Sequence, residues 1–386
     1  MTIDYLREAT AIEDELILSR RHLHAHAEVG FDLDKTVAFV YETLASYGLE
    51  PAYLTQHGVT ATVGKGRPVV LLRVDMDALP GTELSAVDFR SEKNMHMCGH
   101  DMHTAMLLGA AKVLKAHEAE LEGTVKFVFQ PAEELLTGAR SLIDAGLLEN
   151  PEPDAAFMIH VNTLDEPALY LKPGVMTTTN NNFRITVRGK SAHGAMPELG
   201  IDATYVGAQI VTALPGIVAR EIPFANSAVV TTGHFVAGDA PNSIPDTAVI
   251  EGTIRSFDEE IHAFVKKRVI EISESVAHTY RAEAEVEILS EAKVVKNDPA
   301  LTDLARKAAL DAGIDVREAK AVQASEDFSF IASRVPSVMM MLGVKPESGE
   351  VYPLHNARAV FNESSLKIGV AALAAIAVGF LQTRKK

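Results

Sequence analysis

The chain has 386 residues, 47% hydrophobic and 23% charged, so it is long enough for two globular domains. Its formal net charge of −16 disfavours a nucleic-acid partner, because an acidic surface repels phosphates. The single cysteine excludes an internal disulfide, and the N-terminus lacks the apolar core of a signal peptide, which favours a cytoplasmic protein. The apolar run at 368–382 is shorter than the roughly 20 residues that span a bilayer, so we predict a buried helix and no membrane partner.

The first part of the chain alternates strand-like and helix-like segments. Continuous apolar runs open the segments 69–75, 124–134 and 154–160, and each run ends in an acid or a histidine. Helical spacing of apolar residues occupies 104–117 between them. Buried strands that alternate with helices predict an α/β domain with a largely parallel sheet.

The middle of the chain has a different pattern. Its order of strands and helices is β-α-β-β-α-β, which is typical of a ferredoxin-like α+β unit. The α/β character returns after about residue 291, so we expect this unit, 179–290, to be inserted into a discontinuous domain of 1–178 and 291–386. The predicted segments are strands at 183–189, 227–235, 247–257 and 284–290 with helices at 201–220 and 258–280, followed by a helix near 299–312 and a strand at 337–343.

Polar residues follow the predicted strands of the α/β domain. In an open α/β sheet, functional groups gather beyond the carboxyl ends of the strands. If the strands are parallel, these groups meet at one edge of the sheet. They are Asp75 and Asp77, Glu133 and Glu134, His160, His355, and the loop of Cys98, His100, Asp101 and His103 that precedes a helix.

These residue types suit a metal-dependent hydrolase. Cysteine, histidine and glutamate are ligands of zinc and its neighbours, and Cys98 and His100 flank one glycine, so both can reach metal from one loop. Of the adjacent Glu133 and Glu134, one can bind metal while the other takes the proton of a water molecule. Singly, most of these residues have ordinary structural roles in turns and at helix starts, but their shared edge favours a site.

We interpret His22 and His26 as residues of a surface helix and not as metal ligands. They are four residues apart on one helical face, but no acid accompanies them at a predicted strand end. We therefore expect an amphipathic surface helix there.

The chain resembles the M20 metallopeptidase family, in particular its amidohydrolase branch of hippurate hydrolases, N-acyl-amino-acid deacetylases and auxin-conjugate hydrolases. The resemblance extends from residue 22 to residue 356, and CGHDMH together with QPAEE is specific for this branch. The matching stretches are HLHAHAEVGFDLDKT, RVDMDALP, MCGHDMHTAMLLGAA, FVFQPAEE, GKSAHGAMP, APNSIPD and YPLHNA.

This resemblance implies a catalytic domain with two divalent metal ions (zinc, manganese, cobalt or nickel) and an inserted lid that forms a homodimer or a higher oligomer. The Cys98 thiolate would bridge the metals. Where the wider family has a histidine ligand in an H-x-D motif, this chain has Asp75, so that ligand is absent. The implied metal ligands are Cys98, His100, Glu134, His160 and His355.

The resemblance also implies roles for residues that do not bind metal. Glu133 would be the general base, and Asp77 would orient a ligand. His193 would enter the active site of the partner subunit, and Asn242 and Arg255 would bind substrate.

The expected reaction is hydrolysis of the amide bond of small N-acyl amino acids, with a metal-bound water as nucleophile and Glu133 as base. One alternative is a dipeptidase or aminoacylase of the same family. A second is a hydrolase with Cys98 as nucleophile and His100 or His103 as base. A third is a metal-bearing binding protein without catalysis.

Overall fold

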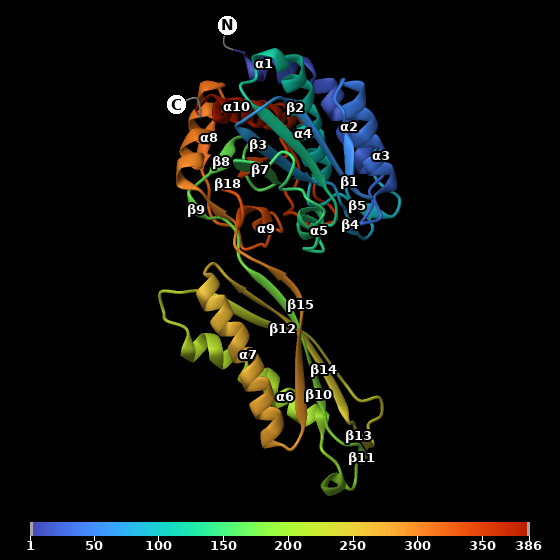
Figure 1. Ribbon diagram of the computed structural model, residues 1–386. Coiled ribbons are helices and arrows are strands. Elements are labelled where there is room, and N and C mark those ends of the chain that lie inside the picture. Colours follow the sequence, from blue (N-terminus) through green and yellow to red (C-terminus); the bar gives the residue numbers. More distant parts are fainter. Residues whose placement is uncertain (1–2, 384–386) are drawn as a thin grey trace. The chain divides into compact units, whose positions relative to one another are not determined.

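The computed structural model describes residues 3–383, so the outermost residues of the predicted catalytic domain, 1–2 and 384–386, lie outside it. The chain divides into two compact units (Figure 1). Unit 1 contains the residues up to Met176, Val295–Ala321 and the residues from Asp327 on. Unit 2 contains Thr177–Val294 and the short segment Val322–Glu326, which the sequence does not predict.

An eight-stranded, mostly parallel sheet forms the centre of unit 1. Parallel pairing joins β3 to β6 and β7, β7 to β18, and β8 to β17, whereas β1, β2 and β6 pair antiparallel and so do β18 and β8. The strand order is β1 (Ala52–Thr55), β2 (Gly58–Gly64), β6 (Thr124–Gln130), β3 (Val69–Asp75), β7 (Ala155–Asn162), β18 (Ser337–Gly343), β8 (Leu169–Leu171) and β17 (Val316–Glu318).

Helices cover this sheet. α4 and α10 pack against β3 and β7, and α1 and α2 pack on α4. Two short strand pairs complete the unit, β4 (Leu79–Pro80) with β5 (Asn94–Met95) and β9 (Gly174–Val175) with β16 (Lys296–Asn297). The helices are α1 (Tyr5–Ala11), α2 (Glu13–Ala25), α3 (Asp34–Ser46), α4 (His100–Ala116), α5 (Gly138–Asp144), α8 (Pro299–Asp311), α9 (Ser329–Ala332) and α10 (Leu366–Thr383), with 3-10 turns at Glu118–Glu120 and Glu363–Ser365.

The C-terminal helix is buried as predicted, although the length argument behind the prediction was wrong. The helical stretch Glu363–Thr383 has 21 residues and is long and apolar enough to cross a membrane by length and composition. However, 78% of its most apolar window is buried inside the protein, where α10 packs against α1, α4 and α8. Its apolar residues therefore belong to the core of unit 1.

Unit 2 has the predicted β-α-β-β-α-β order. Its four strands pair antiparallel in the order β12, β14, β10, β15, and α6 and α7 bury apolar side chains against one face of the sheet (Figure 1). Asp202 and Asp258 start these two helices by accepting hydrogen bonds from main-chain N–H groups of the first turn. The elements are β10 (Asn180–Arg188), β11 (Ala192–His193), α6 (Ala203–Ala213), β12 (Ala228–Ala237), β13 (Ser243–Ile244), β14 (Thr247–Ser256), α7 (Glu259–Thr279) and β15 (Glu283–Ala292), with single turns at Pro197–Leu199 and Ile217–Glu221.

The fold class predicted from the sequence is confirmed: a largely parallel α/β sheet is interrupted by a ferredoxin-like α+β unit. Strands such as β3 and β18 have the predicted bounds because each is a continuous apolar run that is buried on both faces. The segment joining the units differs from the predicted boundaries, since β15 continues its pairing with β10 as far as Ala292.

Candidate metal centre

The candidate site lies at one edge of the unit 1 sheet, because its parallel strands end there. β3 ends at Asp75, β6 at Gln130 and β7 at Asn162, and parallel pairing places the three ends on the same side. Glu133 and Glu134 follow β6, and His160 lies near the end of β7.

A glycine shapes the loop that carries Cys98 and His100. Gly99 lies between them in a left-handed conformation, with φ of +86°, and precedes the first residue of α4. A Cβ atom at this position would lie 2.3 Å from Val161 Cγ2, so the backbone also approaches β7 too closely for a side chain. Glycine is therefore required here for both conformation and space.

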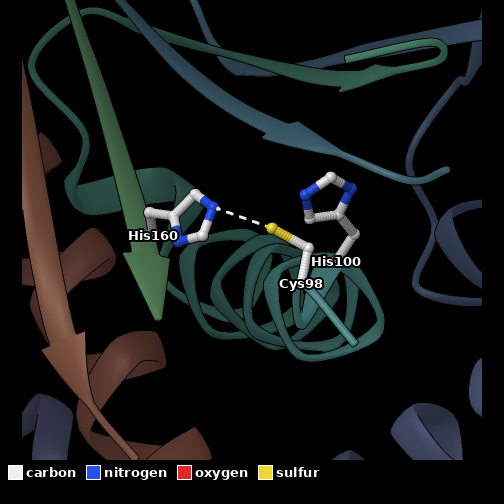
Figure 2. Close-up of side chains that lie close together, drawn as sticks. All are labelled: Cys98, His100 and His160. Carbon is white, nitrogen blue, oxygen red and sulfur yellow. Dashed lines mark hydrogen bonds between the residues drawn. The ribbon is translucent and has the colours of Figure 1, made fainter. Parts of the chain in front are cut away.

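Five of the predicted ligand residues lie close together. Cys98 Sγ is 3.6 Å from His160 Nε2 and 3.3 Å from His355 Nε2, and Figure 2 shows the thiol between the His160 and His100 rings. Glu134 Oε1 is 3.5 Å from His355 Nε2 and 3.9 Å from His100 Nε2. Cys98, His100 and His160 are buried, whereas the His355 side chain is 55% exposed, so the cluster is accessible from the His355 side.

Hydrogen bonds fix the protonation of two neighbouring imidazoles. His160 Nδ1 donates to the carbonyl of Val161, which leaves the lone pair of Nε2 directed at Cys98. His103 Nδ1 donates to Asp75 Oδ1 at 2.5 Å, and its Nε2 accepts from the N–H of Val161. Both nitrogens of His103 are therefore engaged away from the thiol, which removes His103 as a base for Cys98.

Strained backbone flanks the two glutamates. Ala132 and Leu136 have φ of 54° and 55°, a conformation that non-glycine residues rarely adopt. The main-chain N–H groups of Glu133 and Glu134 both donate to Asp77, whose Oδ1 also lies 3.6 Å from His100 Nδ1. Asp77 thus connects the glutamate loop to His100. Strain of this kind is typical of functional sites.

Burial changes the acidity of the candidate ligands. It raises the pKa of Glu134 to about 7 and raises the pKa of the Cys98 thiol well above its usual range. Burial alone would raise the pKa of Asp75 as well, but the nearby His100, His103 and Arg73 hold it well below its usual range. Glu134 and Cys98 must lose their protons before they bind a cation, so metal binding releases protons.

The residues present fit divalent metal ions. Both ring nitrogens of His100 and Oε1 of Glu134 are buried without a hydrogen-bond partner among the described residues 3–383, and orphaned polar atoms of this kind are costly unless a ligand satisfies them. Ligand atoms of Cys98, His100 and His160 lie within 4.8 Å of one another, as do those of Cys98, Glu134 and His355. The two groups share Cys98, which is the arrangement that two ions joined by one thiolate would need.

The remaining predicted site residues lie in unit 2. His193 and Asn242 are neighbours, because the N–H of Gly194 donates to the carbonyl of Asn242, and both side chains are exposed. Arg255 lies in β14 of the four-stranded sheet, near the Ser256 end of that strand, where its Nη1 donates to Ser325 Oγ at 3.2 Å. His193 pairs with Ser243 before β14 begins at Thr247, and the strand from Thr247 to Arg255 is roughly 27 Å long.

Sequence reasoning missed a buried polar network on α2. His22 and His26 are exposed, as predicted, but His24 between them is buried, with Nδ1 at 2.8 Å from Asp101 and Nε2 at 3.0 Å from Glu83. Arg20 Nε also donates to Asp101. The partners are 59 and 77 positions from His24 along the chain, so the local pattern carried no signal of the pairing.

An open α/β sheet with a thiol, imidazoles and carboxylates gathered at its strand ends is the arrangement expected of a metal-dependent hydrolase. The family comparison is specific: the model of Peptidase family M20/M25/M40 matches residues 71–378, and this chain belongs to that family.

Relatives match over nearly the whole chain. Thermostable carboxypeptidase 2 of Saccharolobus solfataricus is 36% identical over 384 residues, which cover 96% of each chain. N-acetyl-L-cysteine deacetylase of Bacillus subtilis is 36% identical over 341 residues, which cover 86% of this chain and 81% of that protein. The crystal structure of Bacillus subtilis YXEP protein, a dinuclear metal binding peptidase from the M20 family, has a TM-score of 0.83 at 31% identity and covers 97% of this chain and 99% of its own.

The expected class of enzyme is confirmed by these comparisons. The protein is a hydrolase of amide bonds, and its family resemblance and its clustered ligand residues support two divalent metal ions. Relatives of this kind act on small N-acyl amino acids or on peptides, as their names state.

Proposed function

We propose that this protein hydrolyses the amide bond of small N-acyl amino acids, with Cys98, His100, Glu134, His160 and His355 as ligands of two divalent ions. The observation that carries the proposal is the pair of ligand groups sharing Cys98, with Glu133 beside them. The chemistry of the ligands admits zinc, manganese, cobalt or nickel. A thiolate ligand must stay reduced, which supports a cytoplasmic location.

Glu133 is the proposed general base. A ligand oxygen of Glu133 lies within 4.8 Å of those of His100 and Glu134, so the carboxylate adjoins the cluster and is not needed to complete the two ligand groups. Bound divalent ions supply a Lewis acid that polarises the acyl carbonyl and lowers the pKa of water. Glu133 accepts the proton of the attacking water and returns it to the leaving nitrogen. Asp77 holds the main chain of Glu133, and its Oδ1 lies 3.6 Å from Nδ1 of His100.

Replacing Glu133 with glutamine tests this role. Glutamine keeps the size of the side chain but cannot accept a proton, so we expect kcat to fall by about 100-fold or more while metal content is unchanged. Metal analysis and turnover are measured on the same sample. Substantial turnover by E133Q at full metal occupancy would refute the base assignment.

The separation within unit 2 supports a proposal that the enzyme is a homodimer. His193 and Asn242 lie beyond the Thr247 end of β14, and roughly 27 Å of strand separates that end from Arg255, so one copy of unit 2 is not expected to bring all three to one small substrate. We assign oxyanion stabilisation to His193 of the partner subunit, together with Asn242 of the partner subunit, and binding of the substrate carboxylate to Arg255. The β12 edge is suited to pairing with a second copy, since no described strand pairs with its outer side and it exposes Val229, Phe235 and Val236.

Mixed dimers test whether His193 of one subunit acts in the active site of the other subunit. E133Q and H193A are each expected to be inactive, but a dimer containing one chain of each has one complete site. Mixing the chains under conditions that exchange subunits should restore about a quarter of wild-type activity. Failure to restore activity in demonstrated mixed dimers would place His193 in its own chain's site or outside catalysis.

A substrate panel identifies the acyl group and separates the rival functions. The relative named as a carboxypeptidase supports peptidase activity as a second candidate, so the panel includes dipeptides and short peptides beside N-acetyl, N-benzoyl and indoleacetyl amino acids. Each compound is assayed with zinc, manganese, cobalt and nickel after removal of bound metal. Inactivity towards every compound at full metal occupancy would favour a binding protein, and activity that survives chelation would favour a thiol hydrolase.

A further inference from the structure

A second carboxylate, Asp327, is held firmly near the proposed base. Its side chain accepts hydrogen bonds from Arg73 Nη2 at 2.7 Å, from Gln130 Nε2 at 2.7 Å and from the main-chain N–H of Ala139 at 2.8 Å. These donors come from β3, from the end of β6 and from α5, so Asp327 joins three elements of unit 1. Asp327, Arg73 and Gln130 are all fully buried.

The main chain of Asp327 contacts Glu133. The N–H of Asp327 donates to Glu133 Oε1 over 3.4 Å, while the N–H of Glu133 donates to Asp77. Both ends of the glutamate are therefore held, the backbone by Asp77 and the carboxylate by Asp327. The 3.4 Å contact is long for a hydrogen bond, so a small displacement of Asp327 is enough to break it.

Arg73 connects this anchor to the ligand cluster. Its guanidinium donates to Asp327 and also to Asp75, whose other oxygen accepts from His103. The Arg73 guanidinium also lies 6.0 Å from the centre of the Phe328 ring, next to Asp327 in the chain. A fully buried cation that is paired on both sides has little freedom to move, because either displacement would leave a charge unpaired.

We propose that Asp327 is a positioning residue for the hydrolysis, which aims the Glu133 carboxylate through its main-chain N–H and is itself fixed by Arg73 and Gln130. The inference rests on the proposed role of Glu133 as base. A glutamate side chain rotates about three bonds, and the contact to Oε1 reduces this freedom, so the carboxylate is held in one orientation for proton transfer. The role of Asp327 is therefore geometric, and it should change the rate of the chemical step without changing substrate or metal binding.

The variant D327N tests the proposal. Asparagine keeps the size of the side chain, but it cannot pair with the Arg73 charge and presents N–H groups towards the donors of Gln130, Arg73 or Ala139. The resulting displacement should lower kcat by about 10- to 100-fold at full metal occupancy and leave KM within about twofold. Unchanged kcat in a folded, metal-loaded D327N protein would overturn the proposal.

Asp154 provides a control with the same kinds of donor at a more exposed position. It also accepts from an arginine, Arg67, and from a main-chain N–H, that of Val69, but it lies where β3 begins, at the opposite end from Asp75. We expect D154N to lower thermal stability and leave kcat unchanged. An equal loss of kcat in D154N and D327N would show a general effect of destabilisation and would overturn the proposal.

A double-mutant cycle shows whether Asp327 acts through Glu133. In E133D the shortened carboxylate no longer reaches the N–H of Asp327, so D327N should cost little further activity in that background. An equal fold-loss in both backgrounds would mean that Asp327 acts independently of Glu133. If D327N does not fold, Gln130→Met is measured in its place. This change removes both hydrogen bonds that Gln130 Nε2 donates to the Asp327 carboxylate and keeps the ion pair between Asp327 and Arg73.

The E133Q result distinguishes a failure of the base assignment from a failure of the positioning role of Asp327. Full turnover by E133Q would remove the base assignment and the inference with it. An inactive E133Q together with a fully active D327N would leave the base assignment intact and overturn only the positioning role.

Discussion

Cys98 is the residue on which the two candidate ligand groups converge. Its thiol lies within 3.6 Å of the Nε2 atoms of both His160 and His355, and the ligand atom of Glu134 is in the same group. A sulfur atom in this position would serve two ions only as the thiolate. Because burial raises the pKa of the thiol, bound ions would have to displace its proton.

We predict that C98S lowers the metal content. A serine hydroxyl is a far weaker ligand than a thiolate because its proton is much harder to remove, so the two groups lose their shared ligand. Metal analysis after dialysis should give less than half of the wild-type content, together with a lower midpoint of thermal unfolding. Retention of both ions by C98S would disprove the bridging role.

At the level of elements, the start of α4 positions the cluster. Gly99 turns the chain between Cys98 and His100, and Asp101 in the first turn of α4 accepts hydrogen bonds from Arg20 and His24 on α2. α2 therefore holds the end of α4 that carries the ligands. The hydrogen bonds of Asp101, together with the turn at Gly99, therefore set the distance between the candidate ligands Cys98 and His100.

We predict that G99A disturbs the cluster. Alanine at φ of +86° is strained, and its Cβ would lie 2.3 Å from Val161, so the loop must move. Metal content should fall, and stability should drop by about 1–3 kcal/mol. The control is G66A, since Gly66 has φ of +76° but open space around it, so it carries the strain without the collision. Equal metal loss in both variants would contradict the role of close packing.

We predict that His24 makes stability depend on pH. Both of its nitrogens face carboxylates, which only accept hydrogen bonds, so the ring carries two protons and a positive charge. Burial lowers the pKa of His24, but the bonds to Asp101 and Glu83 outweigh this and raise it above its usual value. A raised folded pKa contributes stability that is complete below about pH 6.5 and is lost as pH rises through the folded pKa.

Unfolding of H24Q measured between pH 6 and pH 9 tests this dependence. Glutamine can donate to only one carboxylate and has no charge, so at pH 6 the variant should be less stable by about 3 kcal/mol or more. The difference from wild type should narrow as pH rises. H22Q, an exposed change on the same helix, should have little effect, and a difference that widens with pH would contradict the prediction.

At the level of the whole molecule, the sequence predicts the strands and the site edge, because both depend on local patterns of apolar and polar residues. Continuous apolar runs identify the strands, and the polar residues after them identify the edge where the cluster lies, because parallel strands end on one side. Arg73 is a positive charge inside the otherwise apolar part of the run VVLLRVD, and that exception to the pattern was a signal of a buried ion pair. Its partner Asp327 lies 254 positions away, and only the folded chain shows the pairing.

The sequence also predicts only part of the division into two units. The five residues Val322–Glu326 cluster with unit 2 because the carbonyl of Ala324 accepts from the N–H of Thr178 and Ser325 accepts from Arg255. This segment has no periodicity of its own. Its place is decided by contacts with residues that are distant in the chain.

The two ends of the insertion meet in unit 1. The N–H of Met176 donates to the carbonyl of Val295 over 2.8 Å, so the chain leaves and returns at nearly the same point. We predict that a short glycine linker in place of residues 177–294 leaves a unit that folds and binds metal, because unit 1 has its own core. Turnover should be lost with His193, Asn242 and Arg255. Full turnover by the shortened protein would exclude all three from catalysis.

The closeness of Met176 and Val295 has a consequence for how enzymes of this kind diversify. The residues that flank the insertion, Met176 and Val295, are joined by one main-chain hydrogen bond. The inserted segment can therefore be replaced by another without disturbing the strands that precede and follow it. New substrate preferences can then be acquired by grafting another insert onto an unaltered metal-binding framework. Chimaeras that join the Met176 and Val295 ends of this chain to the insertion of a relative are a direct way to engineer specificity.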